Sequence, residues 1–239
     1  MEIDNKKIKM WSQVGPRATF GLACLDLSES EDKLVILTSD VSTSAGLDRY
    51  KKKYPNKYLD VGISEQNLIG TAAGLASEGF KVVTTTFSPF QVLRCAEQIK
   101  VNLGYMKHKI CLVGIASGVV LGNLGYTHCS IEDIAVIKSI PNISIVSPAD
   151  GTEVAKAIFA AVNHHQSVYL RLTGSANNPI IYNEDYDFKI GKSVKIKDGE
   201  DITIFANGSM VSIGQSVEKI LKEKKISTEL INMHTIKPL

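Results

Sequence analysis

The sequence predicts an α/β fold with three layers, in which helices cover both faces of a parallel sheet. Short apolar runs that read as buried strands alternate with helical segments through most of the chain. The runs KLVILTSD and KVVTTTF are nearly continuously apolar or β-branched, as strands covered on both faces are. Crossovers between such parallel strands are right-handed, so the alternation predicts one doubly covered sheet.

The elements follow a polar N-terminal arm, MEIDNKKIKMWSQ, in a regular order. The predicted helices are PRATFGLACLDLSES, NLIGTAAGLASEG, FQVLRCAEQIKVNL, IEDIAVIKSI and DGTEVAKAIFAAVNHH. The predicted strands are KLVILTSD, YLDVG, KVVTTTF, KICLVGIAS, NISIVS and SVYLRLTG. A Gly-rich loop, GVVLGNLGYTHCS, follows the strand KICLVGIAS.

The stretch from residue 60 to residue 90 organises this pattern. Ser64 lies where it can cap a helix, Glu65 is in the first turn, and Gly79 ends that helix. The next strand ends in two aromatic residues, Phe87 and Phe90. We expect the acid and the aromatic pair to share one pocket at the carboxyl ends of the strands.

The chain divides into three parts. Residues 1–174 form the α/β unit, and residues 175–200 are a polar linker with a short hairpin-like piece. Residues 201–239 read as strand, helix and strand, which is too little to bury both faces of a sheet. We therefore expect this partial second α/β unit to be cut short or to lean on something else.

Composition narrows the class of protein. The 239 residues include 44% hydrophobic residues, and the net charge of +2 argues against nucleic acid as the main partner. No segment reads as a membrane span or signal peptide. The cysteines lack CxxC spacing and are expected to be reduced thiols of a cytoplasmic protein: Cys24, Cys95, Cys111 and Cys129.

The motif DVGISEQN followed by TTFSPF resembles the pyrimidine-binding domain of transketolases, which use thiamine diphosphate. The resemblance runs from about Arg17 to the end of the chain, and residues 201–239 resemble the start of the transketolase C-terminal domain. A lone Glu in a first helical turn usually only complements the helix dipole, and two Phe after a strand are usually core. Several motifs agree here in order and spacing.

The resemblance implies roles for the residues around the cofactor. Glu65 would contact the pyrimidine ring nitrogen, while Phe87 and Phe90 would hold the flat ring by offset stacking. The acid would favour the tautomer that takes the thiazolium proton, so it must hold or share a proton. Asp40 in TSDVSTS would lie near the thiazolium ring.

Further residues would face the substrate. His128 in GYTHCS matches the histidine assigned to binding and proton transfer at the donor ketose, a task that suits an imidazole. Arg17 and Arg171 fall where the family holds a phosphosugar, and Ser44 lies near the phosphate. Without the family, His128 would read as an ordinary polar residue at a helix start.

Three departures argue against the standard pentose-phosphate substrates. Ala116 stands where phosphosugar transketolases usually have a histidine, Leu124 replaces an aspartate, and Leu93 replaces a tyrosine. In the family these polar groups contact sugar hydroxyls or phosphate.

The diphosphate half of a cofactor site is missing from the sequence. The family uses a GDG segment with a later Asn that holds Mg²⁺, and KDGED in the linker is the only near match. The chain itself is therefore predicted to hold no metal. The resemblance implies a GDG-containing partner subunit, with this chain as a homodimer within a heterotetramer.

The resulting hypothesis is the second subunit of a split transketolase, a transferase that moves a two-carbon ketol unit from a ketose to an aldose. The alternatives are a 2-oxoacid dehydrogenase beta-type or deoxyxylulose-phosphate synthase-like subunit, and a non-catalytic scaffold subunit. GYTH and FSPF favour transketolase over the first two, and retention of Glu65 and His128 argues against a scaffold.

Overall fold

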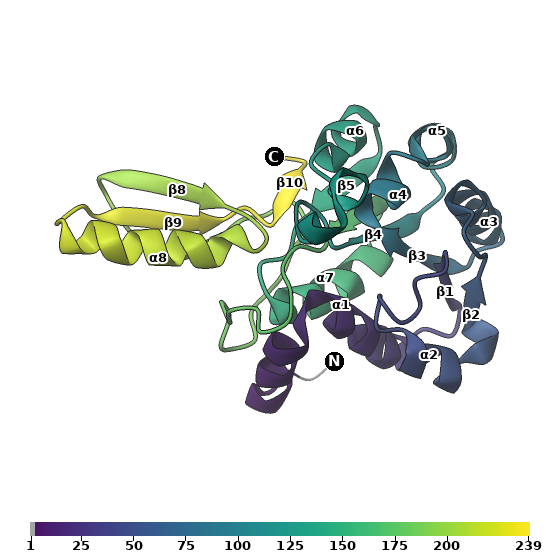
Figure 1. Cartoon of the computed structure of the whole chain (residues 1–239), viewed down its shortest axis with the longest axis horizontal. Coiled ribbons are helices and arrows are strands. Elements are labelled where there is room, and N and C mark those ends of the chain that lie inside the picture. The colour runs from purple at the N-terminus through teal and green to yellow at the C-terminus, as the bar shows by residue number, and fades with distance from the viewer. Residues whose placement is uncertain (1–2) are drawn as a thin grey trace.

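The computed structural model describes residues 3–239 and contains a large α/β body with a smaller unit at one side (Figure 1). A seven-stranded sheet forms the centre of the body. In spatial order its strands are β10 (Thr235–Lys237), β5 (Ile143–Val146), β6 (Ser167–Arg171), β4 (Ile110–Ile115), β3 (Lys81–Phe87), β1 (Leu34–Thr38) and β2 (Tyr58–Asp60). All neighbours pair parallel except β10 with β5.

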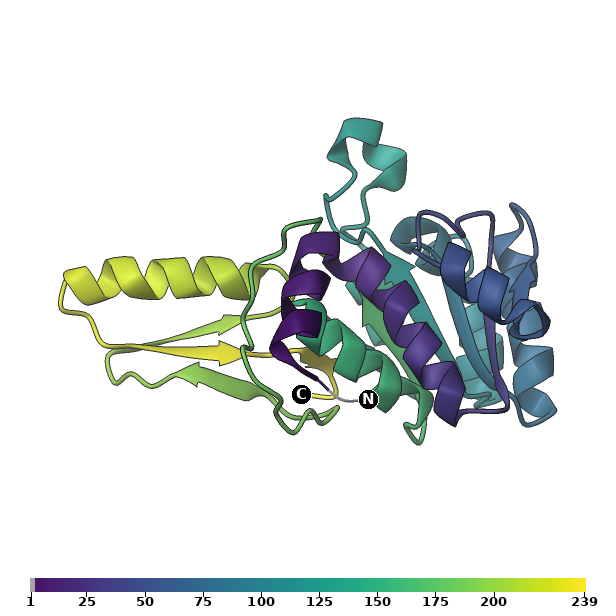
Figure 2. The same ribbon diagram turned by 90° about the horizontal axis from the view of Figure 1, so that it is seen from below.

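Helices cover both faces of this sheet, which confirms the predicted fold class. One face packs against α1 (Asn5–Ser30), α7 (Gly151–Val162) and the short α2 (Asp48–Lys53). Figure 2 shows α1 and α7 lying across that face. The other face carries α3 (Glu65–Ser77), α4 (Ser88–Val92), α5 (Ala96–Ile99) and α6 (Asp133–Ser139). The strands β3 and β4 are buried between the two layers because their side chains are apolar or β-branched.

The polar N-terminal arm is part of helix α1, whose start was predicted only at Pro16. Asp4 caps α1, its carboxylate accepting from the backbone N–H of Lys7 at 2.7 Å. Trp11 is 2% exposed and packs on the start of α7, which explains why the arm is ordered. The helix kinks at Gly15, where φ is +77° and Pro16 follows.

The predicted helix FQVLRCAEQIKVNL is broken into pieces. After α4 and α5 the chain continues as one turn of π-helix, η2 (Lys100–Tyr105). Short 3₁₀ turns occur at η1 (Pro55–Lys57), η3 (Gly122–Leu124) and η4 (Tyr126–His128). The last two lie in a loop that projects from the body, the teal segment at the top of Figure 2.

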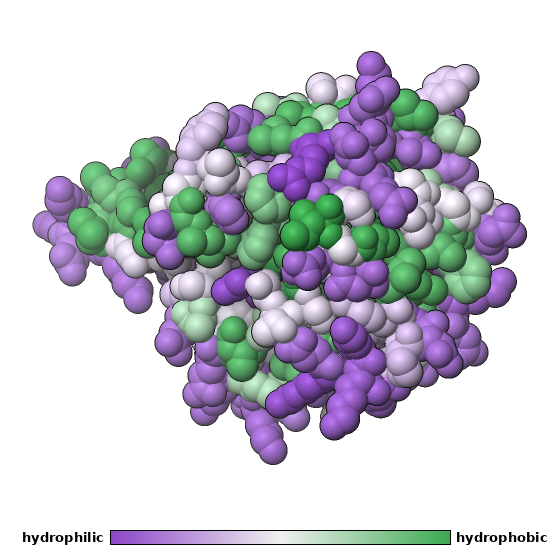
Figure 3. All heavy atoms as spheres, turned by 45° about the vertical axis from the view of Figure 1, so that its right-hand side comes forward, coloured by the Kyte–Doolittle hydropathy of each residue, from purple (hydrophilic) through white to green (hydrophobic). Residues whose placement is uncertain are grey.

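The smaller unit is a three-stranded sheet, β7 (Val194–Lys197), β9 (Thr228–Asn232) and β8 (Ile202–Ala206), with α8 (Met210–Glu223) along it. Strands β8 and β9 are parallel, as strand, helix and strand predict, but β7 pairs antiparallel with β9 instead of forming a hairpin of its own. Apolar side chains remain exposed on this unit, visible on the lobe at the left of Figure 3. They include Ile202, Phe205, Met210, Ile213, Val217 and Ile220.

Candidate active site

A cavity of about 290 Å³ opens at the carboxyl ends of β1 and β3, where parallel sheets hold ligands. It brings together the predicted residues Asp40, Glu65, Phe87 and Phe90. Its other lining residues are Ser39, Val41, Ile63, Thr86 and Arg94. The expectation that the acid and the aromatic pair share a pocket is confirmed.

Glu65 is the first residue of α3 and is 4% exposed. Ser64 occupies the N-cap position, but its hydroxyl donates to the carbonyl of Val61 at 2.8 Å and does not cap the helix. The Ser64 N–H instead donates to the hydroxyl of Ser39 at 3.1 Å, which ties the start of α3 to the end of β1. The first turn of α3, with the buried Glu65, is therefore held against the end of β1.

Arg94 is the partner of Glu65, and the sequence did not single it out. Its Nη1 donates to Glu65 Oε2 at 2.7 Å, and its guanidinium carbon lies 4.3 Å from the centre of the Phe90 ring. The Arg94 side chain is 43% exposed, so the ion pair joins a buried carboxylate to a guanidinium that is in contact with solvent. Its position four residues after Phe90, one helical turn on, was the available signal.

The aromatic pair forms one wall of the cavity. The rings of Phe87 and Phe90 meet edge to face, with centres 6.2 Å apart and planes at 83°. This geometry leaves ring surface available instead of stacking the two rings on each other. Below them, Cys95 donates to the Phe90 carbonyl at 3.3 Å. Burial raises the pKa of the Cys95 thiol to about 12, with the charge of Glu65 adding to the effect, so it stays a thiol.

His128 lies in the projecting loop and contacts the same aromatic pair. Its ring centre is 5.8 Å from that of Phe87 and 5.3 Å from that of Phe90, both edge to face. Its Nδ1 is 3.1 Å from the Thr127 hydroxyl. His128 is half-buried; it contacts the aromatic wall of the cavity but is not one of the residues that line it.

Asp40 enters the cavity on a strained turn after β1. Its φ is +55°, in the left-handed region that Asp tolerates better than most residues. The carboxylate of Asp60 accepts from the N–H groups of Asp40 and Gly62, both at 3.0 Å, and so links the turns that follow β1 and β2.

None of the four predicted substrate residues lines this cavity: His128 contacts its aromatic wall, and the other three lie elsewhere. Arg17 and Ser44 are half-buried on α1 and on the loop after β1. Arg171 lines a separate hollow of about 350 Å³ with Thr173 and Asn207. Its Nε donates to Asp133 at 2.8 Å, and its side chain is only 13% exposed. Its predicted role with phosphate therefore remains a prediction.

The three departures occupy different environments. Ala116 is buried at the end of β4 with φ of +54°. Leu93 and Leu124 are 42% and 51% exposed, on α4's C-cap and in the projecting loop. Apolar side chains at these two positions add surface without adding hydrogen-bonding groups for a sugar.

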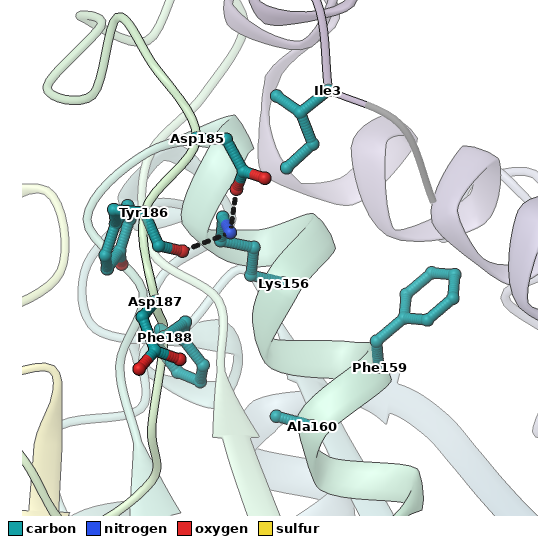
Figure 4. A pocket seen from close by; sticks show the side chains of 8 residues that line it. All are labelled: Ile3, Lys156, Phe159, Ala160, Asp185, Tyr186, Asp187 and Phe188. Atoms are coloured by element: carbon teal, nitrogen blue, oxygen red, sulfur yellow. Dashed lines mark hydrogen bonds and ion pairs between the residues drawn. The ribbon is translucent and has the colours of Figure 1, made fainter.

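A larger hollow, of about 700 Å³, lies elsewhere, on the outer side of α7 (Figure 4). Its cation, Lys156, is already held between the carboxylate of Asp185 and the carbonyl of Tyr186. The rest of its lining is chiefly Ile3, Phe159 and Phe188. Because its lysine is already paired within the chain and none of the predicted site residues lies in it, we take the Glu65 cavity as the candidate site.

Within residues 3–239, no three or more His, Cys, Asp or Glu side chains gather where a metal ion could be held. The same residues include no helix of the length and apolar character that a membrane crossing requires. All four cysteines are free thiols.

Comparison with known proteins agrees with the geometry. Residues 12–178 match the pyrimidine-binding domain of transketolase, and residues 191–239 match the transketolase C-terminal domain. The chain is 34% identical to a subunit of the apulose-4-phosphate transketolase of Phocaeicola vulgatus, over 95% of this chain and 73% of that one. It is 30% identical to a subunit of the 6-deoxy-6-sulfo-D-fructose transketolase of a Clostridium species, over 93% and 69% of the two chains. A solved structure described as a split gene transketolase, inactive beta4 tetramer, superposes with a TM-score of 0.86 at 30% identity, over 94% and 73% of the two chains.

Proposed function

The chain belongs to the transketolase family, and from that premise we propose that it is the pyrimidine-binding subunit of a two-chain transketolase. The enzyme would move a two-carbon ketol unit from a ketose donor to an aldose acceptor. One observation supports this above the others: a buried carboxylate, Glu65, opens into the same cavity as an aromatic pair. A scaffold has no need of such an acid.

The cavity fits the pyrimidine ring of thiamine diphosphate. Glu65 would hold or share a proton with a ring nitrogen, and Phe87 and Phe90 would hold the ring faces. When bound, the cofactor supplies the acidic thiazolium carbon at which ketol transfer takes place. Because Glu65 already pairs with Arg94, Arg94 would have to share or release that carboxylate when the ring enters.

The substrate side would be formed by the remaining residues. His128, held against the aromatic pair, would bind the donor ketose and move a proton there. Asp40 would lie near the thiazolium ring. Arg17, Ser44 and Arg171 are proposed for the distal end of the sugar.

A partner chain would complete the site. The diphosphate needs Mg²⁺ and oxygen ligands, and we propose that a GDG-containing subunit supplies most of them. Two relatives are themselves named as transketolase subunits, and the solved structure is named as a tetramer. Exposed Gly70 and Gly74 on α3 have open space around them and would allow the close approach of a second copy.

The test of the reaction is hydrogen–deuterium exchange at the thiazolium carbon in the reconstituted complex. Glu65→Gln keeps the shape of the side chain but removes the ionisable group, so exchange should slow by roughly 10²- to 10⁴-fold. Glu78→Gln, at the exposed end of the same helix, is the matched control and should leave exchange unchanged. Unaltered exchange in Glu65→Gln would remove Glu65 from its role.

The test of the partnership is calorimetry on the isolated chain with thiamine diphosphate and Mg²⁺. Because no motif here holds the diphosphate, tight binding should appear only after the partner is added. Micromolar binding together with ketose cleavage by this chain alone would refute the two-chain arrangement.

A further inference from the structure

A buried hydrogen-bond cluster lies beside the candidate active site, and of its members only Arg171 has a proposed role with the substrate. Its centre is Asp133, which is fully buried. Asp133 Oδ2 accepts from Ser88 Oγ at 3.2 Å, from the Tyr169 hydroxyl at 2.8 Å and from Arg171 Nε at 2.8 Å. The hydroxyls of Ser88 and Tyr169 also lie within hydrogen-bonding distance of each other, and both residues are fully buried.

The members of this cluster belong to the two halves of the site. Ser88 starts α4 and directly follows Phe87. Asp133 starts α6, five residues after His128. Arg171 Nη2 donates to the carbonyl of Ser130, at the foot of the projecting loop. One carboxylate therefore connects the aromatic pair to the loop that contains His128.

The loop has few other attachments. Between Gly118 and Cys129 no residue is buried. Its foot is closed by the backbone bonds between Gly118 and Ser130, at 3.0 and 2.8 Å. Apart from the ring contacts of His128 with Phe87 and Phe90, the loop is therefore held to the body at its foot, where Arg171 and Asp133 lie.

The cluster is packed without spare room. Gly114 of β4 faces it, and a Cβ there would lie 2.6 Å from the Tyr169 hydroxyl and 2.8 Å from Ser88 Oγ. Burial raises the pKa of Tyr169, with the Asp133 charge adding to it, so the phenol stays a donor. Buried ion pairs of this kind add little net stability, because desolvation offsets their attraction. The cluster therefore contributes mainly by fixing the orientation of the side chains and of the loop that it joins.

We propose that Asp133 is a positioning residue, which holds the His128 loop in register with the Phe87–Phe90 pair through Arg171 and Ser88. Its catalytic consequence rests on the proposed function, but its geometric consequence does not. The two are tested by separate measurements.

The geometric test is the NMR signal of the His128 ring in the full chain. Two phenyl rings within 6 Å shift this signal by their ring currents. Phe90→Leu calibrates the shift that one ring causes. Asp133→Asn should move the His128 signal at least as far as Phe90→Leu does. Glu153→Gln, which neutralises another fully buried carboxylate bonded to a tyrosine, should leave it in place.

Milder variants guard against misfolding. Tyr169→Phe and Arg171→Lys retain Asp133 and should move the same signal in the same direction by smaller amounts. If all three variants leave the His128 signal at its wild-type position, the proposal is wrong.

The catalytic test compares turnover with cofactor affinity in the reconstituted complex. Displacing His128 by about 1 Å should lower turnover by roughly 10- to 100-fold in Asp133→Asn while cofactor affinity stays within twofold. A moved NMR signal with unchanged turnover would support the positioning role and refute the proposed function of His128. Turnover lowered only through lost cofactor affinity would contradict both.

Discussion

Arg94 sits between two groups whose roles the sequence predicted, Glu65 and Phe90. A half-exposed guanidinium that bonds a buried carboxylate and lies on an aromatic face combines a charged hydrogen bond with a cation–π contact. Losing it would leave the carboxylate of Glu65 desolvated and unpaired by any cation in the cavity lining.

We predict that Arg94→Met lowers the free energy of unfolding by about 1–3 kcal/mol, because it leaves a buried charged acceptor without its donor. In a double-mutant cycle with Glu65→Gln, the coupling should be about 1 kcal/mol. Urea denaturation of the chain measures both, with Arg49→Met on the exposed face of α2 as control. Additive effects of the two substitutions would show that the pair does not interact in solution.

Among single residues, the sequence predicted those that belong to short motifs. Glu65, Phe87 and Phe90 were placed together because each lies at the end of an element in a parallel sheet, and such ends converge. Arg94 and Asp133 were missed because their partners are 29 and 38 residues away in the chain and only the fold brings them close. In the sequence alone, a charged residue in a predicted helix is equally consistent with a solvent-exposed side chain.

Helices α1 and α7 pack closely at the first residue of α7. Gly151 starts α7, and a Cβ there would lie 2.6 Å from the Cβ of Trp11. We predict that Gly151→Ala separates the helices and lowers the free energy of unfolding by about 1–3 kcal/mol.

The control, measured at a concentration at which the chain is monomeric, is Gly70→Ala within α3, where a Cβ meets nothing within 4 Å in the single chain. That change should raise the free energy of unfolding by about 0.5–1 kcal/mol through helix propensity. Thermal or urea unfolding of both variants is the measurement. Equal effects of the two substitutions would contradict the close packing of α1 on α7.

The order of elements was predictable because apolar runs and helical periodicity are local signals. Three features were not. The N-terminal arm is helical because Trp11 finds a buried place on α7, which polar composition cannot reveal. The predicted helix after β3 is interrupted at residues 93–95, which local periodicity does not indicate. Strand β10 has only three residues, too few to form a periodic pattern. The boundaries of the three parts of the chain remain predictions.

At the scale of the whole molecule, buried ionisable groups join the two sheets. Glu153 of α7 accepts from the Tyr186 hydroxyl at 2.5 Å and from Asn232 of β9 at 3.0 Å. Burial raises the pKa of Glu153 to about 7, and burial lowers the pKa of His234, between β9 and β10, to about 4. Asp150, at the start of α7, also has its pKa raised by burial.

The signs of these shifts are opposite. As pH rises from about 4.5 to 7, Glu153 ionises first in the unfolded chain, so its contribution to folding is lost over that window. As pH falls from 6.5 to about 4, His234 is protonated first in the unfolded chain, so stability is lost toward acid. Glu153→Gln should therefore remove a loss of roughly 3 kcal/mol between pH 4.5 and 7.5, measured by urea unfolding across that range. Parallel pH profiles for the variant and the wild type would contradict the assignment.

Self-association provides a second prediction at this scale. If α3 packs against a second copy through its open glycine face, Gly74→Lys should weaken dimer formation at least tenfold, because a long charged side chain would fill that space. Sedimentation equilibrium measures the dissociation constant. Ser216→Lys on exposed α8 is the control, and weakening by that variant alone would place the interface on the apolar face of α8 instead.

Strand β10 has a consequence for how the protein is made. It follows the three-stranded unit in the chain, yet it pairs with β5 at the edge of the seven-stranded sheet. During synthesis, one edge of β5 therefore stays unpaired until the ribosome has made the linker, β7, β8, α8, β9 and finally β10. Open edges recruit other chains, so this interval is when a nascent chain is most prone to aggregate. The length of the smaller unit thus sets the time that passes before the seven-stranded sheet can be completed by β10.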